Sequence, residues 1–272
     1  IFSLVLYQNG SWEEATLSRT APCQNCYSLT KTVIATGIGM AQDQGLLSVD
    51  DPIIRYLEKD LPPKFDEKLE NVKIRHLLSQ TMGNETGYLF EADRFTHGTD
   101  DWLTFVLSQP LTYAPGSKFV YSNSTYYLLS CILHRAAGMT AEAFIRRHLF
   151  QPLGIGDYAW AACPKGETSG GTGLYLSTGD LAKIGLVYLH QGEYAGKRLL
   201  SREWIKEATR HQGQEDDPAY GYSFWMNQVG YEGNGAYRQM LLMVPERQLV
   251  LAAHVFQEEY DYIALLEQAG IL

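Results

Sequence analysis

A serine and a lysine three residues apart form the first candidate catalytic pair. Ser28-Leu29-Thr30-Lys31 stands where a β-prone stretch gives way to apolar residues at helical spacing. Residues three apart share one face of a helix, about 5–6 Å apart, so Lys31 reaches the Ser28 hydroxyl. Free N–H groups and the dipole at a helix N-terminus stabilise an oxyanion and lower the pKa of a buried lysine. The pattern predicts a Ser28 nucleophile whose proton Lys31 accepts.

The serine–lysine spacing has a plainer interpretation as well. A serine that begins a helix is often only its N-cap, and one match to this spacing is expected by chance in a chain of 272 residues. The position favours chemistry, because a strand-to-helix junction exposes a side chain at the edge of a sheet. We therefore take Ser28 and Lys31 as candidates and look for their partners.

Tyr121-Ser122-Asn123 supplies further polar groups just before a strongly apolar helical stretch. A phenol accepts a proton when cationic neighbours stabilise its anion, and an amide holds a substrate amide or a lysine. The same Y-x-N pattern at residues 7–9 lies in a hairpin turn signal and is structural. Tyr121 and Asn123 become candidates, beside the alternatives of a packed core tyrosine and a helix-capping asparagine.

The secondary-structure elements that position these groups are predicted strands near both ends of the chain and predicted helices between them. Residues 1–7, a second short strand after the turn at 8–10, and segments 220–229, 235–244 and 249–256 are β-prone. Apolar residues recur at helical spacing between them. The expected helices run from residue 28 to a stop at Gly45, and over 53–57, 75–79, 102–107, 126–137, 141–150, 180–191 and 260–269.

Strands at both ends with helices between them predict an α/β (α+β) fold. One sheet built from both termini beside an all-α lobe is the economical arrangement, with the site between them. No linker and no internal repeat divides the chain. We expect one domain over residues 1–272, with the α/β lobe at about 1–27 and 157–272 and the helical lobe at about 28–156.

Composition excludes several classes of partner. The formal net charge is −9 and the pI is near 5.3, which argues against nucleic acid and polyanionic substrates. No apolar run approaches the roughly 20 residues of a membrane-spanning helix. Residues 1–7 lack the length and basic flank of a signal peptide, but the chain opens without methionine. The compartment stays open, with the cytoplasm slightly favoured, and the oligomeric state is not predicted.

The cysteines pose a separate question about metal or redox chemistry. Cys23 and Cys26 form a C-x-x-C pair, which suits a redox motif or half of a zinc site. No second pair or histidine cluster follows, although Cys131 and Cys163 are present. We expect small, half-buried side chains leading into the helix, and no metal or organic cofactor.

A series of ordered motifs resembles the β-lactamase-related serine hydrolases. The resemblance covers nearly the whole chain and points to the branch of class C β-lactamases, D-alanyl carboxypeptidases and esterases, which uses Y-x-N. It implies a β-lactamase/transpeptidase-like fold with an antiparallel sheet. The motifs are Tyr27-Ser-Leu-Thr-Lys31, Gly45-Leu-Leu-Ser-Val-Asp-Asp-Pro52, Ile74-Arg-His-Leu-Leu78, Tyr113-Ala-Pro-Gly116, Tyr121-Ser-Asn123, Gln151-Pro-Leu-Gly154, Gly170-Gly-Thr-Gly173 and Ser177-Thr-Gly-Asp-Leu-Ala-Lys183.

The resemblance implies a role for each candidate residue. Ser28 would form an acyl-enzyme, Lys31 would help to deprotonate it, and Tyr121 would pass the proton to the leaving group. Asn123 would orient Lys31 and the substrate amide. The oxyanion hole would use the Ser28 N–H and one N–H from a strand that lines the site. The implied substrates are small esters, amides or β-lactams.

The sequence departs from the family on that strand. Related enzymes carry Lys-Thr-Gly or Lys-Ser-Gly, and here Gly233, Asn234 and Gly235 take these positions, with Ala236 as the second oxyanion donor. A register one residue later is an alternative. The missing lysine removes the usual cation for a substrate carboxylate, and Arg238 is a candidate to replace it. This change favours an esterase or specialised amidase over efficient penicillin hydrolysis. It also keeps open a catalytically silent, penicillin-binding-like ligand-binding or sensor module.

Overall fold

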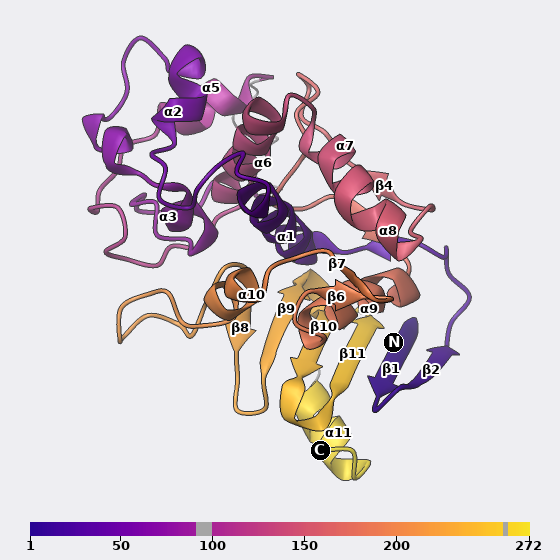
Figure 1. The fold of residues 1–272 in the computed structure, drawn as a ribbon. Coiled ribbons are helices and arrows are strands. Elements are labelled where there is room, and N and C mark those ends of the chain that lie inside the picture. The colour runs from indigo at the N-terminus through magenta and orange to yellow at the C-terminus, as the bar shows by residue number, and fades with distance from the viewer. Residues whose placement is uncertain (91–99, 258–260) are drawn as a thin grey trace.

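A six-stranded antiparallel sheet lies beside a group of helices in the computed structural model, which describes residues 1–90, 100–257 and 261–272 (Figure 1). β1 pairs with β11 in the register Val5↔Ala252, so the two ends of the chain share one sheet, as the sequence predicts. The spatial order is β2-β1-β11-β10-β9-β8. The strands are β1 Ser3–Gln8, β2 Ser11–Thr16, β8 Trp225–Met226, β9 Tyr231–Gly235, β10 Gln239–Val244 and β11 Leu249–His254.

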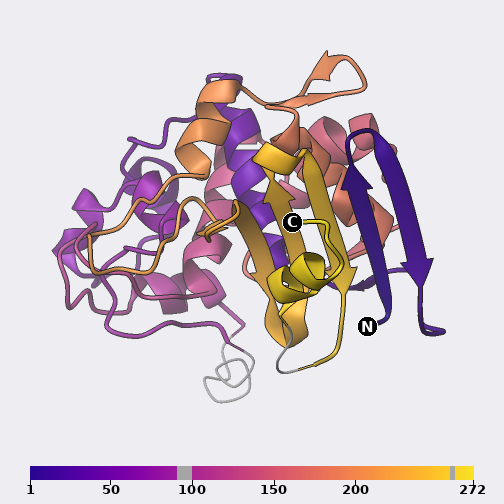
Figure 2. The same cartoon turned by 90° about the horizontal axis from the view of Figure 1, so that it is seen from below.

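Strands β10 and β11 are buried at every position because helices cover both faces of the sheet. Side chains alternate between the two faces of a strand, so successive apolar residues of one strand pack into two separate cores, one on each face of the sheet. Leu241 and Val250 join the core on the face covered by α9 (Thr178–Leu189). Leu242 and Leu251 join the core with α11 (Tyr262–Gln268), the yellow helix on the sheet in Figure 2.

Helix α1 (Thr30–Asp43) lies between the sheet and the helices of residues 54–150 (Figure 1). Its residues are buried from Thr30 to Ala41, and it packs against α6 (Ser124–Ala137) and α7 (Ala141–Ile145). Glycine permits a close approach, because a Cβ on Gly39 would lie 2.5 Å from the indole of Trp204. This central, tightly packed helix gives its N-terminal residues a fixed position between the two parts of the molecule.

The remaining elements confirm most of the expected helices and add several that the sequence did not predict. The helix expected over 141–150 divides into α7 and a π-turn at Arg146–Phe150, and the last helix begins at Tyr262, whereas residue 260 lies outside the described residues. The unpredicted helices and strands of the described residues include α8, α10, β3 to β7 and most of β9. The bounds are α2 Ile54–Leu57, α3 Ile74–Leu78, α5 Trp102–Leu107, α8 Gln151–Leu153, α10 Arg202–Ala208, β3 Gln24–Asn25, β4 Ala159–Trp160, β5 Leu174–Leu176, β6 Glu193–Tyr194 and β7 Lys197–Arg198.

Two strand predictions in the C-terminal third are wrong in extent. The strand expected over 220–229 shrinks to β8, because Tyr222 N donates to Ala208 O (2.9 Å) and Ser223 has a φ of 74°. The strand expected over 235–244 begins only at Gln239, because the two preceding residues have left-handed backbone angles. A hydrogen bond to α10 replaces a ladder hydrogen bond in the first segment, and left-handed backbone geometry interrupts the strand in the second.

Helix α6 is the apolar helix that the sequence marks most strongly. Its residues are buried from Ser124 to Leu133, with Gly138 ending it at a φ of 69°. Within the described residues, no helix on its own has the length and apolarity to cross a membrane. The bent pair Ser124–Ala137 and Ala141–Leu153 meets that test only when both halves are taken together.

Acid should destabilise the fold through His254 at the end of β11. This side chain is fully buried, its Nδ1 lies 2.8 Å from Gln239 Oε1, and burial lowers its pKa to about 4. An unfolded histidine titrates near 6.5, so between pH 6.5 and 4 the unfolded chain binds a proton that the folded chain excludes. We expect the free energy of unfolding to fall over that range, with His254 contributing about 3 kcal/mol.

Urea unfolding between pH 4 and 7 measures this effect. His254→Asn should flatten the pH dependence relative to the wild type, while His211→Asn, in a loop, should leave it as it is. The pKa of His76 is also lowered to about 4 by burial, so the His254→Asn protein should keep part of the acid sensitivity. Equal slopes in wild type and His254→Asn would contradict the prediction.

Candidate active site

Ser28 lies in the 3₁₀ turn Tyr27–Leu29 that leads directly into α1. The chain reaches this turn from β3, and Cys26 N donates to Leu174 O (2.8 Å) beside it. Tyr27 has a φ of 47°, a left-handed value that is uncommon for a non-glycine residue and that occurs where surrounding contacts impose it. The half-buried Ser28 is therefore held on a sharp strand-to-helix turn.

Lys31 lies one turn further along and is oriented toward Ser28. Only 1% of its side chain is exposed. Its Nζ donates to Ser28 Oγ (3.1 Å), to Asn123 Oδ1 (2.6 Å) and to Gly171 O (2.8 Å), all of them uncharged oxygen atoms. The ring of Tyr121 also lies against the amine, with its centroid 4.7 Å from Nζ. The amine thus faces the serine hydroxyl from a buried position, where Asn123 and Gly171 orient it.

Asn123 is the N-cap residue of α6, but its side chain makes no capping hydrogen bond. Its Oδ1 accepts from Lys31, and its Nδ2 donates to Leu89 O (3.1 Å). The side chain is 8% exposed, so both groups are used within the protein. The capping alternative does not describe this residue, because its amide fixes the position of the lysine amine.

Tyr121 contacts both members of the serine–lysine pair. Its ring stacks on Trp225, with centroids 6.0 Å apart and planes at 29°. Burial raises the pKa of Tyr121 to about 12, and a hydrogen bond with Ser28 opposes that rise. The phenol is therefore neutral near pH 7, which suits a group that donates a proton better than one that stands ready as an anion.

The carbonyl of Gly171 is a functional group that the sequence analysis missed. It accepts from Lys31, and the residue must be small, because a Cβ there would lie 2.7 Å from Asn123 Cβ. A Cβ on Gly170 would lie 1.9 Å from Tyr126 O. The Gly-Gly-Thr-Gly run was the available signal, since consecutive glycines mark close backbone approach.

Gly171→Ala should lower kcat about 100-fold for any reaction that uses the Ser28–Lys31 pair. The added methyl group collides with Asn123 and moves the carbonyl that fixes the Lys31 amine, and displacements of about 1 Å in a catalytic group have effects of this size. Steady-state kinetics and thermal unfolding measure the two consequences. Gly156→Ala is the matched control, because a Cβ there meets nothing within 4 Å. A Gly171→Ala protein with unchanged kcat would show that this carbonyl is dispensable.

A cavity of about 970 Å³ opens over these groups. Ser28, Tyr121 and Asn123 share its lining with Asn234, Gly235 and Ala236. Gly233 is not brought into it, because it packs on α1, where a Cβ would lie 2.5 Å from Thr32 Oγ1. The other described residues that line it are Asn25, Tyr27, Phe90, Ala161, Thr172, Gly173, Tyr175, Trp225, Tyr237, Arg238 and Met240.

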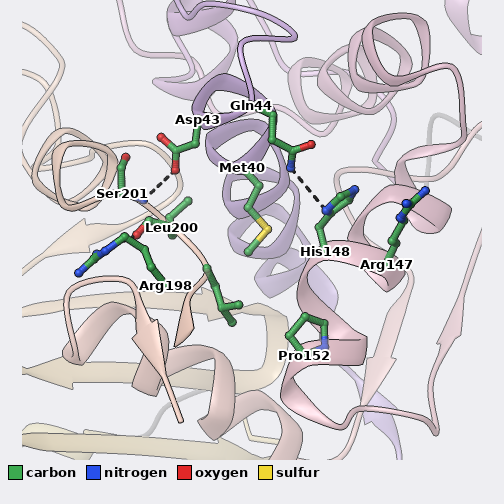
Figure 3. Close-up of a pocket in the computed structure, with 10 residues that line it drawn as sticks. Met40, Asp43, Gln44, Arg147, His148, Pro152, Arg198, Leu200 and Ser201 are labelled. Atoms are coloured by element: carbon green, nitrogen blue, oxygen red, sulfur yellow. Dashed lines mark hydrogen bonds between the residues drawn. The ribbon is translucent and has the colours of Figure 1, made fainter. Parts of the chain in front are cut away.

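A second cavity, of about 530 Å³, lies at the other end of α1 (Figure 3). Its polar groups are engaged in structure: Asp43 accepts from Ser201 N (2.7 Å), and Gln44 lies 3.5 Å from His148 Nδ1. The Ser201 hydroxyl accepts from Trp204 N as a helix cap (3.1 Å). Among the residues described, this lining joins no hydroxyl to an amine, in contrast to the cavity over Ser28.

The four cysteines are free thiols in the structure. Cys26 is buried, which raises the pKa of its thiol to about 12, and Cys23 donates to Asp157 O (3.3 Å). The C-x-x-C pair therefore forms no disulfide here. Its side chains pack beside the strand that leads to Ser28, as the plainer interpretation expects.

Comparison with known proteins gives relatives of the same kind over most of the chain. Penicillin-binding protein 4* of Bacillus subtilis is 31% identical over 137 residues, which is 48% of this chain and 29% of that protein. A putative D-alanyl-D-alanine carboxypeptidase of Salmonella enteritidis is 22% identical over 240 residues, 68% of this chain and 54% of that protein. The matches thus cover between about a third and a half of these relatives' own length.

Solved structures share the fold at low sequence identity. A putative 6-aminohexanoate-dimer hydrolase from Bacillus anthracis has a TM-score of 0.82 at 17% identity, covering 99% of this chain and 77% of that one. A penicillin-binding protein from Bacillus halodurans has a TM-score of 0.80 at 20% identity, covering 99% and 95%. The family model described as Beta-lactamase matches residues 23–261. This chain therefore belongs to the β-lactamase family, whose fold is that of serine hydrolases.

Proposed function

We propose that this chain is a serine hydrolase that cleaves small esters or amides through an acyl-enzyme on Ser28. The observation that carries the proposal is the 3.1 Å hydrogen bond between Lys31 Nζ and Ser28 Oγ, in a setting where Asn123 and Gly171 fix the amine. A nucleophile oriented by an adjacent base at the floor of a cavity is the arrangement that acyl transfer requires. Relatives named as a carboxypeptidase and a D-stereospecific amidohydrolase support the same reaction class.

The first half-reaction forms the ester between enzyme and acyl group. Ser28 Oγ attacks the substrate carbonyl, and its proton passes to the lone pair of the Lys31 amine, which in its neutral form keeps two N–H groups for Asn123 Oδ1 and Gly171 O. The N–H groups of Ser28 and Ala236 hold the oxyanion. When the carbon–oxygen or carbon–nitrogen bond breaks, the Tyr121 phenol gives its proton to the leaving group and regains one from Lys31.

The second half-reaction returns the free enzyme. Water attacks the acyl carbon and gives its proton to the same Lys31–Tyr121 pair. The bond between Ser28 Oγ and the acyl carbon breaks, Ser28 takes up that proton, and the carboxylic acid leaves. Protons and bonds balance over the cycle, so the scheme needs no further reagent.

The lining of the cavity favours an ester or an unstrained amide over a penicillin. Gly233 stands where related enzymes carry a lysine, and it packs against α1. Of the described residues that line the cavity, Arg238 is the one with a charged side chain. The usual cation for a β-lactam carboxylate is thus replaced, at most, by an exposed arginine at the rim.

Side-by-side assays with a nitrophenyl ester, a D-alanyl-D-alanine peptide and benzylpenicillin test the proposal. We expect measurable turnover of the ester, slower turnover of the peptide, and little of the penicillin. Mass spectrometry after a fluorophosphonate should find the added mass on the peptide that contains Ser28. A protein with no turnover and no adduct would refute the assignment.

The alternative is a penicillin-binding-like sensor that is acylated but does not turn over. Glycine in place of the strand lysine is the observation that favours it. A stable benzylpenicillin adduct on Ser28, together with no hydrolysis of any ester, would support the sensor. Turnover of the ester would support the hydrolase.

A further inference from the structure

Exposed aromatic side chains gather at the mouth of the Ser28 cavity. Phe90, Tyr175 and Tyr237 line it with 37%, 39% and 41% of their surface exposed. Phe256, 60% exposed, stacks on Tyr237 with ring centroids 4.4 Å apart. Single exposed apolar residues are ordinary on a soluble surface, but a group of them around one concavity marks a place where an apolar ligand is received.

Tyr237 is held at this mouth in a strained conformation. It and Arg238 have φ values of 60° and 67°, two consecutive non-glycine residues in the left-handed region. Such a conformation is unfavourable for a residue with a side chain and persists where surrounding contacts impose it, often at ligand sites. The contacts here are Phe256 on one side of the Tyr237 ring, Tyr27 on its edge at 5.2 Å, and a hydrogen bond from Tyr262 to Arg238 O (2.7 Å).

The aromatic residues that line the cavity form two groups by their contacts, and each group is here called a wall. Tyr121 and Trp225 stack on each other and form the wall that the leaving group meets, because Tyr121 gives it a proton. Tyr27 directly precedes Ser28 and contacts Tyr237. Tyr175 pairs with Asn25, two residues before Tyr27. The second wall therefore remains for the acyl group.

We infer that this enzyme prefers esters and amides whose acyl group carries an aryl ring or a comparably bulky apolar group, seated against Tyr27, Tyr175 and Tyr237. The inference rests on the proposed acyl transfer at Ser28. The walls offer aromatic faces and edges, which favour rings in stacked or edge-to-face arrangements. Burial of one such group corresponds to a preference of about 10–100-fold in kcat/KM over an acetyl group.

The test compares p-nitrophenyl phenylacetate with p-nitrophenyl acetate, each rate divided by that of the uncatalysed hydrolysis. The two esters share a leaving group, so their corrected ratio reports the acyl site alone. We expect a ratio of about 10 or more in the wild type and a fall of at least fivefold in Tyr237→Gly and in Tyr175→Ala. Tyr237→Gly removes the ring at a backbone angle that suits glycine. Tyr237→Phe should keep the ratio, as should Trp12→Ala, an exposed aromatic on β2.

A wild-type ratio near one would overturn the inference, and so would a high ratio that both ring deletions leave unchanged. NMR titrations of the Ser28→Ala protein compare the binding of phenylacetamide with that of acetamide. This comparison tests the aromatic acyl site separately from the proposed hydrolase activity. Saturable binding of phenylacetamide that Tyr237→Gly weakens supports the aromatic site even if neither ester is hydrolysed. Turnover of both esters with no preference would leave the hydrolase standing and remove only the acyl preference.

Discussion

Ser28→Ala should lower the rate of nitrophenyl ester hydrolysis by about 10⁴-fold or more. The hydroxyl is the group that the Lys31 amine contacts at 3.1 Å, and alanine leaves the attack to unassisted water. Removing the nucleophile from a catalytic set of this kind has effects of at least that size. Single-turnover and steady-state kinetics with the same ester measure the loss. The fluorophosphonate adduct should disappear with it.

The fold should survive this substitution. Ser28 is half-buried and alanine fits the same turn, so the change in the free energy of unfolding should be about 1 kcal/mol or less. Thermal unfolding checks this point, and Ser11→Ala on the exposed strand β2 controls for the loss of any serine. Equal hydrolysis by wild type and a well-folded Ser28→Ala protein would remove Ser28 from the chemistry.

The local part of the site is the part that the sequence predicts well. The spacing of Ser28 and Lys31 puts both on one helical face, and the structure gives 3.1 Å between their polar atoms. Helix geometry fixes that relation over one turn, whatever the rest of the chain does. A short sequence separation also defines the contact by which Ser177 Oγ accepts from Asp180 N (3.1 Å) and caps α9.

The distant partners follow only from the ordered motifs. Asn123 lies 92 residues from Lys31 in the chain, and the pattern Y-x-N does not by itself predict which distant residue it contacts. The Gly171 carbonyl is harder still, because every residue has a carbonyl and its use depends on where the backbone passes. A run of glycines indicates a close approach but not the group it approaches.

The strand beside the site shows where local patterns fail. Tyr237 and Arg238 are not residues that a sequence rule assigns to left-handed backbone, yet they end the extended run before β10. Aromatic contacts with Tyr27 and Phe256 hold this loop, and those contacts form only in the folded chain. Tertiary packing thus overrides β propensity where the wall of the cavity is built.

Lys31→Met should reduce kcat/KM for the ester by about 10²–10⁴-fold, the range expected for loss of a positioned base. Methionine keeps the length of the buried side chain and removes the amine that contacts Ser28 Oγ. Lys206→Met, exposed on α10, is the matched control. Rates and thermal unfolding of both variants should be measured at several pH values.

The pH profile distinguishes a lost base from a merely disturbed site. Without the amine, hydroxide must remove the Ser28 proton, so the residual rate should rise about tenfold per pH unit. The pKa of Tyr121 is raised to about 12, so its phenol stays protonated at the pH values of the assay. Its titration therefore adds no break to the plot of rate against pH. A disturbed but intact mechanism would instead keep the wild-type profile at a lower level. A Lys31→Met protein within about threefold of the wild type would show that another group takes the proton, and the acyl-transfer scheme would need a different base.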